Sequence, residues 1–246
     1  MPDLCPILLG PLTPPHRPWR TILLTAAMPI LFSGCLLLRG RDFGSWAQSG
    51  EKIDLVHIMG PVSNKSMEPN ARIAMIPIFG DMPQPYLDQL NRNLVNEAKI
   101  YFKANTLEVD RYGRFASYIR PENLMPTDGA FNIGEIGRLG RILGVSYVLC
   151  AHLPSYRLHP PQELAMHFIL VDSTTFSAWF EMKASYDASE QAVLILADRY
   201  LRSRVGKPYN QTNLDILLRS PSQFSSLAAA HAMGTMAEVI WGHRKK

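Results

Sequence analysis

The chain has 246 residues, of which 47% are hydrophobic and 19% are charged, and its formal net charge is +4. This composition excludes a collagenous or broadly disordered chain and predicts one or two domains with a buried core. The basic residues are dispersed, with their densest cluster at 244–246. We expect no nucleic-acid partner, because nucleic-acid binders carry a basic stripe beside a readout element.

An uncharged run of 18 residues, Thr21–Leu38, follows a basic segment near the N-terminus. A basic region, an apolar stretch and small residues near its end are typical of an export signal. The run contains Leu31-Phe32-Ser33-Gly34-Cys35, which resembles the lipobox of bacterial lipoproteins, although Phe32 stands where that family usually has Leu. The resemblance implies a signal peptide over 1–34, cleavage between Gly34 and Cys35, and lipidation of Cys35.

Two other interpretations of the same run stay open. An uncleaved transmembrane anchor is one, because about 20 apolar residues span a bilayer, and basic residues on both sides leave its orientation undecided. A soluble protein is the other. Leu36 follows the cysteine, and resemblance to enteric lipoproteins then implies the outer membrane, facing the periplasm, rather than retention at the inner membrane.

The mature chain begins with a predicted tether over 35–70, rich in turn residues, in which Ile53–Met59 is apolar enough for a strand. A folded domain over 71–203 follows. Its first strand is predicted at Ile73–Ile78, and Pro77 indicates that this strand ends there or lies at an edge. A helix introduced by two prolines is predicted to end near Asn105.

The middle of the domain alternates further predicted strands and helices. Thr106–Tyr112 is a predicted strand, and 113–131 is an irregular loop. Asn132 then caps a helix, with Glu135 as its capping-box partner, and Gly144 stops it. Beyond it we expect a strand over Val145–Leu153, a turn-rich excursion over 154–161, a central strand over 164–170, a turn at 172–175 and a strand over 178–184.

The C-terminal part is predicted to be helical. Asp187 caps a helix, with Glu190 in the box position, and 204–246 comprises a linker over 204–220 and a helix over 222–241. The order β-α-β-α-β-β-β-α plus a C-terminal helix predicts an α/β fold with α+β character. It would have a mixed sheet of about five strands with helices packed on it.

This order contains short phrases that resemble one group of envelope lipoproteins. The phrases are Leu143-Gly144-Val145-Ser146-Tyr147-Val148-Leu149, then Leu170-Val171-Asp172, then Trp179. The group comprises the curli-export pore lipoprotein, activator lipoproteins of penicillin-binding proteins, the Pel-export lipoprotein and flagellar accessory lipoproteins. Its activities differ, so the resemblance implies the fold and an envelope location but no single activity. A pore is not expected, because we find no long amphipathic strand pairs.

The side chains that could act in catalysis or bind a metal form no recognisable catalytic motif. His159, His167 and Glu163 flank one turn and leave a metal site as a minor alternative to structural roles. Glycines at 134, 137, 140 and 144 indicate close helix packing rather than a phosphate loop. Cys150 is expected to be a lone buried thiol. The aromatic residues Tyr147, Tyr156 and Trp179 are expected in the core, with a partner groove as the alternative.

We therefore expect no enzyme, no cofactor and no metal. The predicted function is a membrane-anchored periplasmic scaffold or accessory subunit of an envelope assembly or export machine. Its partners would be membrane lipid through Cys35, envelope proteins and further copies of itself. The alternative is a periplasmic ligand-binding or enzymatic domain with an N-terminal anchor and a site formed by 113–131 and 154–161.

Overall fold

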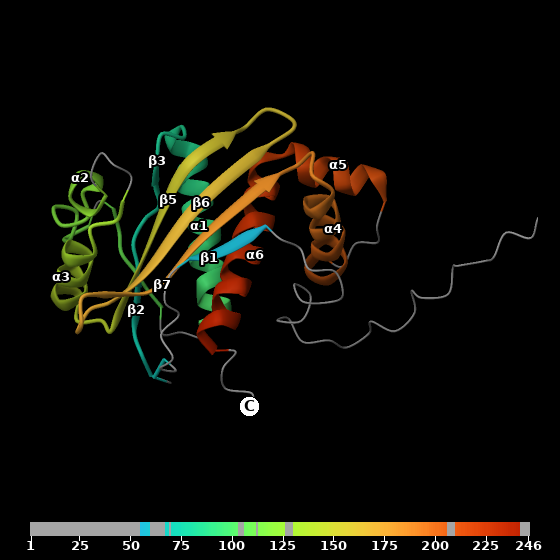
Figure 1. Ribbon diagram of the computed structural model, residues 1–246. Helices are drawn as coiled ribbons and strands as arrows, with labels where there is room; N and C mark the ends of the chain where they lie inside the picture. Colours follow the sequence, from blue (N-terminus) through green and yellow to red (C-terminus); the bar gives the residue numbers. More distant parts are fainter. Residues whose placement is uncertain are drawn as a thin grey trace, which may run out of the picture. The chain divides into compact units, whose positions relative to one another are not determined.

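Figure 1 shows a computed structural model of the chain, which describes residues 55–59, 67–68, 70–102, 106–111, 113–125, 130–205 and 210–241. The predicted signal peptide and the lipidation site, Gly34 and Cys35, lie outside these residues, as does most of the predicted tether. Cleavage and lipidation therefore stay predictions, and so do the proposed domain boundaries.

One mixed sheet organises the described residues. Its order is β1-β7-β6-β5-β2-β4, and β3 pairs with β5 beside β2. Strand β2 is parallel to β4 and β5, whereas β5, β6, β7 and β1 are antiparallel neighbours. The strands are β1 (Val56–Met59), β2 (Ile73–Met75), β3 (Phe79–Gly80), β4 (Thr106–Glu108), β5 (Tyr147–Arg157), β6 (Glu163–Asp172) and β7 (Ser177–Asp187).

The predicted α/β class with a mixed sheet is confirmed, and so is the central position of the fourth predicted strand, which is β6. The predicted number of about five strands is wrong, because the described part of the chain has seven. One addition is β1, which pairs with β7 at the edge. The other arises at Pro77: Ile76 N donates to Leu149 O at 3.0 Å, but Ile78 N donates to Asn91 Oδ1 instead. Proline has no N–H to continue the ladder, so the predicted strand becomes β2 and β3.

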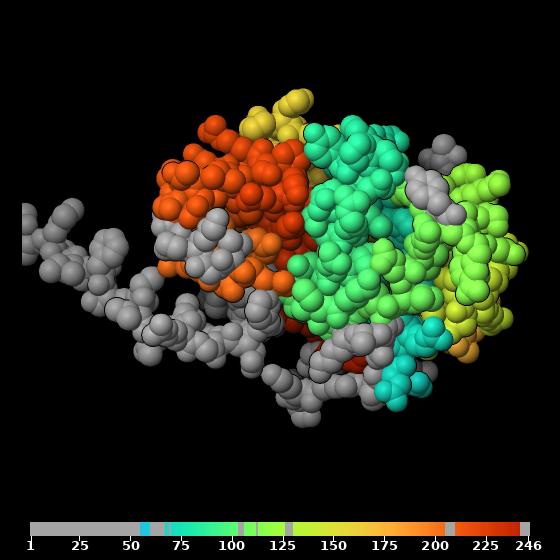
Figure 2. All heavy atoms as spheres, turned by 180° about the vertical axis from the view of Figure 1, so that it is seen from behind, coloured from blue at the N-terminus to red at the C-terminus, as the bar shows by residue number. Residues whose placement is uncertain are grey.

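Helices cover the two faces of the sheet unequally. They are α1 (Gln84–Tyr101), α2 (Pro121–Leu124), α3 (Ile133–Leu143), α4 (Gln191–Tyr200), α5 (Gln211–Arg219) and α6 (Pro221–Trp241), with a π-helical turn over Leu201–Val205. One face packs in a core with α1, α4, α5 and α6, and Figure 2 shows α1 and α6 side by side over it. The other face packs against α3, which lies beside one end of the strands (Figure 1). No helix within the described ranges combines the length and apolarity that crossing a bilayer requires.

Helix α3 forms where its local signals predicted. Asn132 Oδ1 accepts a hydrogen bond from Glu135 N at 3.1 Å, and Gly144 ends the helix with a φ of 66°. The reciprocal half of the predicted capping box is absent at this site, because the Glu135 carboxylate pairs with Arg138 and Asn132 N donates to Leu124 O. The Glu135 side chain therefore stabilises the first turn of α3 through its ion pair with Arg138 rather than through a hydrogen bond to the Asn132 backbone.

Of the four glycines predicted to permit close helix packing, Gly137 and Gly140 do so, whereas Gly134 and Gly144 have no close neighbour. A Cβ at Gly140 would lie 1.9 Å from Ser173 Oγ, and one at Gly137 would lie 2.4 Å from the Phe176 ring. Both contacts are far inside van der Waals distance, so the turn between β6 and β7 rests directly on the helix backbone. Arg141 holds the same turn by donating to Ser173 O and Thr174 O.

Four local predictions need correction. The loop at 113–131 contains the short helix α2, and the predicted linker at 204–220 contains α5, which Asn210 caps through Asn213 N. Strand β5 continues to Arg157, because a register shift between His152 and Ser155 accommodates Pro154 in the ladder. Helix α4 begins at Gln191 with Glu190 as its cap; Asp187 instead accepts from the backbone and hydroxyl of Ser189.

Candidate functional site

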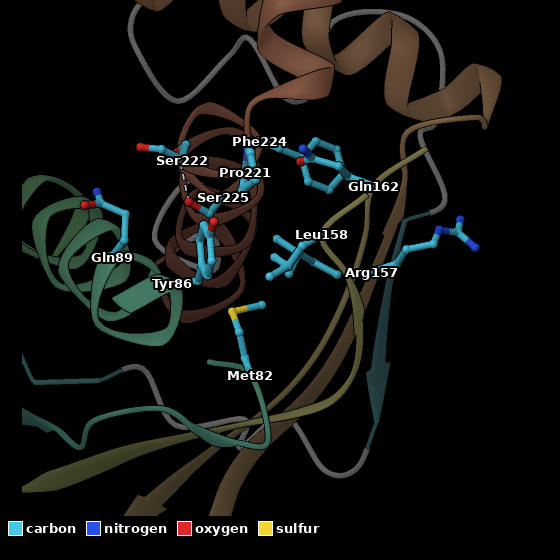
Figure 3. A pocket seen from close by; sticks show the side chains of 11 residues that line it. Met82, Tyr86, Gln89, Arg157, Leu158, Gln162, Pro221, Ser222, Phe224 and Ser225 are labelled. Carbon is cyan, nitrogen blue, oxygen red and sulfur yellow. Dashed lines mark hydrogen bonds between the residues drawn. The ribbon is translucent and has the colours of Figure 1, made fainter. Parts of the chain in front are cut away.

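The far end of the β5–β6 hairpin meets the first turns of α1 and α6, and a small pocket lies between them (Figure 3). We call it the tip pocket. Its enclosed space is about 10 Å³, which is about what one water molecule requires. It is lined by Met82, Tyr86, Gln89, Arg157, Leu158, Gln162, Leu164, Pro221, Ser222, Phe224 and Ser225.

Hydrogen bonds to neighbouring segments fix the walls of the tip pocket. Asn93 Nδ2 donates to Ser225 Oγ at 2.8 Å and joins α1 to α6. The Tyr156 hydroxyl donates to Asp81 O at 3.2 Å and joins β5 to the segment before α1. Arg157 holds the hairpin turn, because its Nε donates to Pro161 O and its Nη2 to Asp187 Oδ2 at 3.2 Å.

Gln162 is the unusual residue of this pocket. Its side chain is 1% exposed, and its Nε2 atom is buried without a hydrogen-bond partner among the described residues. Figure 3 shows the side chain beside Phe224 and Pro221, at the start of α6. A buried amide donor that lacks an acceptor is costly, and other buried polar atoms of the described residues, Thr106 Oγ1 and Ser173 Oγ among them, share this state.

A second group of polar and titratable side chains lies on the face of the sheet that packs against α3, in the part of that face that α3 does not cover. We call this part the open face. The strand register places His152, His167, Lys183 and His57 in one row across β5, β6, β7 and β1. The next row consists of the small residues Ser155, Ala165 and Ser185. A shallow trough of about 380 Å³ lies over β6, β7 and β1, where the two rows meet.

The electrostatics of the open face are mixed. His167 Nε2 lies 2.5 Å from Glu181 Oε1, and the His167 ring stacks edge-on against Phe131 with centroids 4.8 Å apart. Partial burial and the neighbouring His167 lower the pKa of His152, while Asp81 acts in the opposite direction. The lining of the trough contains His57, His167 and Lys183 and no carboxylate, and Glu181 pairs with His167 beside it.

The structure does not bring together the residues of the alternative metal site. His167 pairs with Glu181, and Glu163 lies 3.7 Å from the Arg157 guanidinium. Among the residues that the structure describes, no three His, Cys, Asp or Glu side chains are grouped so as to hold a metal ion. Parts of the two segments of the predicted ligand site line different pockets, since 113–115 line a pocket beside β4 whereas Arg157 and Leu158 line the tip pocket. Phe131 and Pro154, in contrast, lie at the same histidine, because Phe131 contacts the His167 ring and Pro154 lines the trough with His167.

The structure confirms that Cys150 is buried and that the aromatic residues of the strands pack in or against the core, as predicted. Cys150 is a free thiol with no exposed surface, and burial raises its pKa. Trp179 is buried against Tyr147 in an edge-to-face contact, with ring centroids 5.9 Å apart. Tyr147 and Tyr156 are half-buried and pack against the same core.

Sequence reasoning missed two buried polar contacts beneath the sheet. His231, in the middle of α6, is 3% exposed and its Nδ1 lies 3.0 Å from the Tyr186 hydroxyl. Arg204 in the π-helical turn pairs with Glu97 of α1, and both side chains are nearly buried. The partners are 45 and 107 residues apart in the chain, so no local motif could have revealed them.

Comparisons with known proteins were made for sequence and for structure. No protein-family model matches the chain, and no curated protein matches it. The dodecameric PelC of Paraburkholderia phytofirmans is similar in structure, with a TM-score of 0.42 at 10% identity over 73% of this chain and 96% of that chain. Lipoprotein GNA1162 of Neisseria meningitidis gives 0.33 at 15% identity over 57% and 99%. Protein CT253 of Chlamydia trachomatis gives 0.36 at 12% identity over 69% and 98%. With all three scores under 0.5, the fold class rests on the strands and helices of this chain.

Proposed function

We propose that this protein is a bacterial envelope lipoprotein that serves as a scaffold or accessory subunit of an assembly or export machine. The observation that carries the proposal is Ser33-Gly34-Cys35 at the end of a basic segment and an uncharged run. Small residues before the cysteine fit the signal peptidase cleft, and the cysteine would become the lipidated first residue of the mature chain.

The physical consequence is a domain on a lipid anchor. Each buried CH₂ contributes roughly 0.8 kcal/mol, so several acyl chains on Cys35 hold a protein firmly at a membrane. The 21 residues from Cys35 to the start of β1 at Val56 span at most about 75 Å when fully extended. This reach is enough for the domain to meet partners in the periplasm, and Leu36 favours anchoring at the outer membrane.

A non-enzymatic role is supported by the use that the fold makes of its reactive side chains. Cys150 is enclosed in the core, His231 is fixed to Tyr186, and Glu97 is fixed to Arg204. Each of these groups stabilises packing between elements. We infer that the protein acts by binding, with membrane lipid, envelope proteins and further copies of itself as partners.

Mass spectrometry of the N-terminus tests the anchor directly. The native protein would be extracted from membranes, digested, and searched for a peptide that begins at an acylated Cys35. The Cys35→Ala variant should keep its signal segment and lose the acyl peptide. An intact Met1 on membrane-embedded protein would contradict the proposal and support an uncleaved inner-membrane anchor, and unprocessed protein in the cytosol would exclude both.

Assembly is tested separately on the same material. Cross-linking in intact cells, followed by light scattering of the detergent-purified protein, should reveal a defined oligomer or a stable complex with another envelope protein. A strictly monomeric protein with no cross-linked neighbour would contradict the scaffold role and leave the ligand-binding alternative. Density separation of the two membranes reports whether the lipoprotein lies in the outer one.

A further inference from the structure

Strand β1 forms one edge of the sheet, beside β7 (Figure 1). Leu55 O accepts a hydrogen bond from Ser185 N at 2.9 Å. Because backbone groups alternate in direction along a strand, the N–H and C=O groups of Val56 and Ile58 point away from β7. No strand within the described ranges pairs with this outer side. Sheets commonly protect such an edge with lysine or proline, and β1 contains neither, so its outer side is open to a further strand.

The side chains of β1 give its two faces different chemistry. Ile58 is 38% exposed and lies opposite Met182, on the face that packs against α1 and α6. His57 is exposed on the open face and lies opposite Lys183, which in turn lies opposite His167. The same edge is therefore apolar on one face and basic on the other.

A strand added at β1 would place its successive side chains on these two faces in turn. Apolar side chains would lie beside Ile58. The others would lie on the open face, where the trough lining contains His57, His167 and Lys183 and no carboxylate, and where Glu181 pairs with His167. Acidic side chains complement this row, because opposite charges on neighbouring strands stabilise a sheet.

Charge also argues against a second copy of this chain as the added strand. Two β1 edges paired side by side would bring two basic rows together on one face of the joined sheet. Like charges opposite each other on neighbouring strands are destabilising. The edge therefore favours a partner of the opposite charge.

We propose that the outer edge of β1 binds an extended segment of a partner protein in which acidic and apolar residues alternate. The segment lengthens the sheet by one strand, with its acidic side chains beside His57 and Lys183 and its apolar side chains beside Val56 and Ile58. Backbone hydrogen bonds supply affinity, and the alternation supplies specificity. This binding mode rests on the proposed scaffold role and gives the partner a defined chemistry.

Fluorescence anisotropy of the full chain in nanodiscs of neutral lipid tests the edge with three labelled octapeptides. The first alternates glutamate and valine, the second has the same composition with its glutamates in one block, and the third alternates lysine and valine. We expect the first peptide to bind about tenfold more tightly than either of the others. High salt should reduce its advantage over the lysine peptide, because screening weakens exposed charge pairs.

Variants separate the contribution of the backbone from that of charge. Ile58→Pro removes an outward N–H that the pairing with β7 does not use, so it should weaken binding by about tenfold and keep the fold. Ile58→Val retains this N–H and is the matched control. His57→Glu combined with Lys183→Glu should reverse the preference, so that the lysine peptide binds more tightly than the glutamate peptide. Arg92→Glu, on the exposed side of α1, controls for the change in net charge.

Circular dichroism of each variant verifies the fold. Failure of the alternating glutamate peptide to bind, or equal binding of the block peptide, would overturn the proposal. Unchanged binding by a folded Ile58→Pro variant, or an unchanged preference in the charge-reversed variant, would overturn it as well. None of these results bears on acylation of Cys35 or on cross-linking in cells, so failure of the edge and failure of the proposed function are distinguishable.

Discussion

His231 should make the stability of the protein depend on pH between about 4 and 6.5. The ring is 3% exposed in the middle of α6 and packs edge-on against Tyr186, with centroids 5.7 Å apart. Burial, aided by the charge of Arg199, lowers the pKa of His231 from 6.5 to about 4. The folded protein therefore keeps this ring neutral, and the Tyr186 hydroxyl can donate to Nδ1.

The size of the effect follows from the difference between the two pKa values. The unfolded chain takes up a proton near pH 6.5, whereas the folded chain resists protonation until about pH 4. The free energy of unfolding contributed by this residue is thus fully present above pH 6.5 and is lost as the pH falls to about 4. At 1.36 kcal/mol per pH unit, the loss amounts to about 3 kcal/mol.

Urea unfolding followed by circular dichroism, repeated from pH 4 to pH 7.5, measures this dependence. The comparison variant is His231→Asn, which retains a polar atom near the position of Nδ1 and cannot titrate. It should be less stable than the unmodified protein at pH 7.5, and the difference should shrink by about 3 kcal/mol on acidification to pH 4. Parallel stability curves for the two proteins would refute the reasoning, because they would show that His231 has the same pKa in both states.

Further predictions concern packing, capping, a buried ion pair and a thiol. Gly140→Ala should destabilise the fold by about 1–3 kcal/mol in urea unfolding, because its Cβ would lie 1.9 Å from a hydroxyl oxygen; Gly134→Ala, with its nearest such contact at 3.6 Å, should be neutral or stabilising. Asn132→Ala should cost about 1 kcal/mol through loss of the α3 cap, and an unchanged denaturation midpoint would disprove that role. Arg204→Met should cost about 3 kcal/mol by leaving a nearly buried carboxylate without its partner, and adding Glu97→Gln should restore part of the loss. Cys150 should react with a maleimide only after unfolding, since burial raises its pKa; rapid labelling of the native chain at this residue would contradict its enclosure.

Elements with strong local signals could be predicted from the sequence. Helix α3 combines a capping asparagine, an apolar stripe and a terminal glycine, and each of these acts within a few residues. The alternation along β6 and β7 likewise fixed which side chains face the helices. Helix α5 also had a usable signal: Asn210 as a cap and Leu214, Leu217 and Leu218 at helical spacing.

Other predictions failed where a distant segment decided the outcome. Strand β5 passes through Pro154 because β6 tolerates a register shift opposite it. Asp187 lies where a helix cap was predicted, but its carboxylate accepts hydrogen bonds from Ser189 and forms an ion pair with Arg157. Local propensity cannot anticipate such competition, because the energies of these hydrogen bonds depend on which groups the fold brings near.

The sequence by itself predicted the α/β class and the order of the principal elements, because these depend on short-range periodicity and composition, and its export segment with Cys35 stays a prediction. Only the tertiary structure decided that Gln162 is buried without an acceptor and that His231 meets Tyr186. Burial and pairing of a polar group are set by segments far apart in the chain, and the sheet that brings α1, α6 and the β5–β6 hairpin together creates both environments.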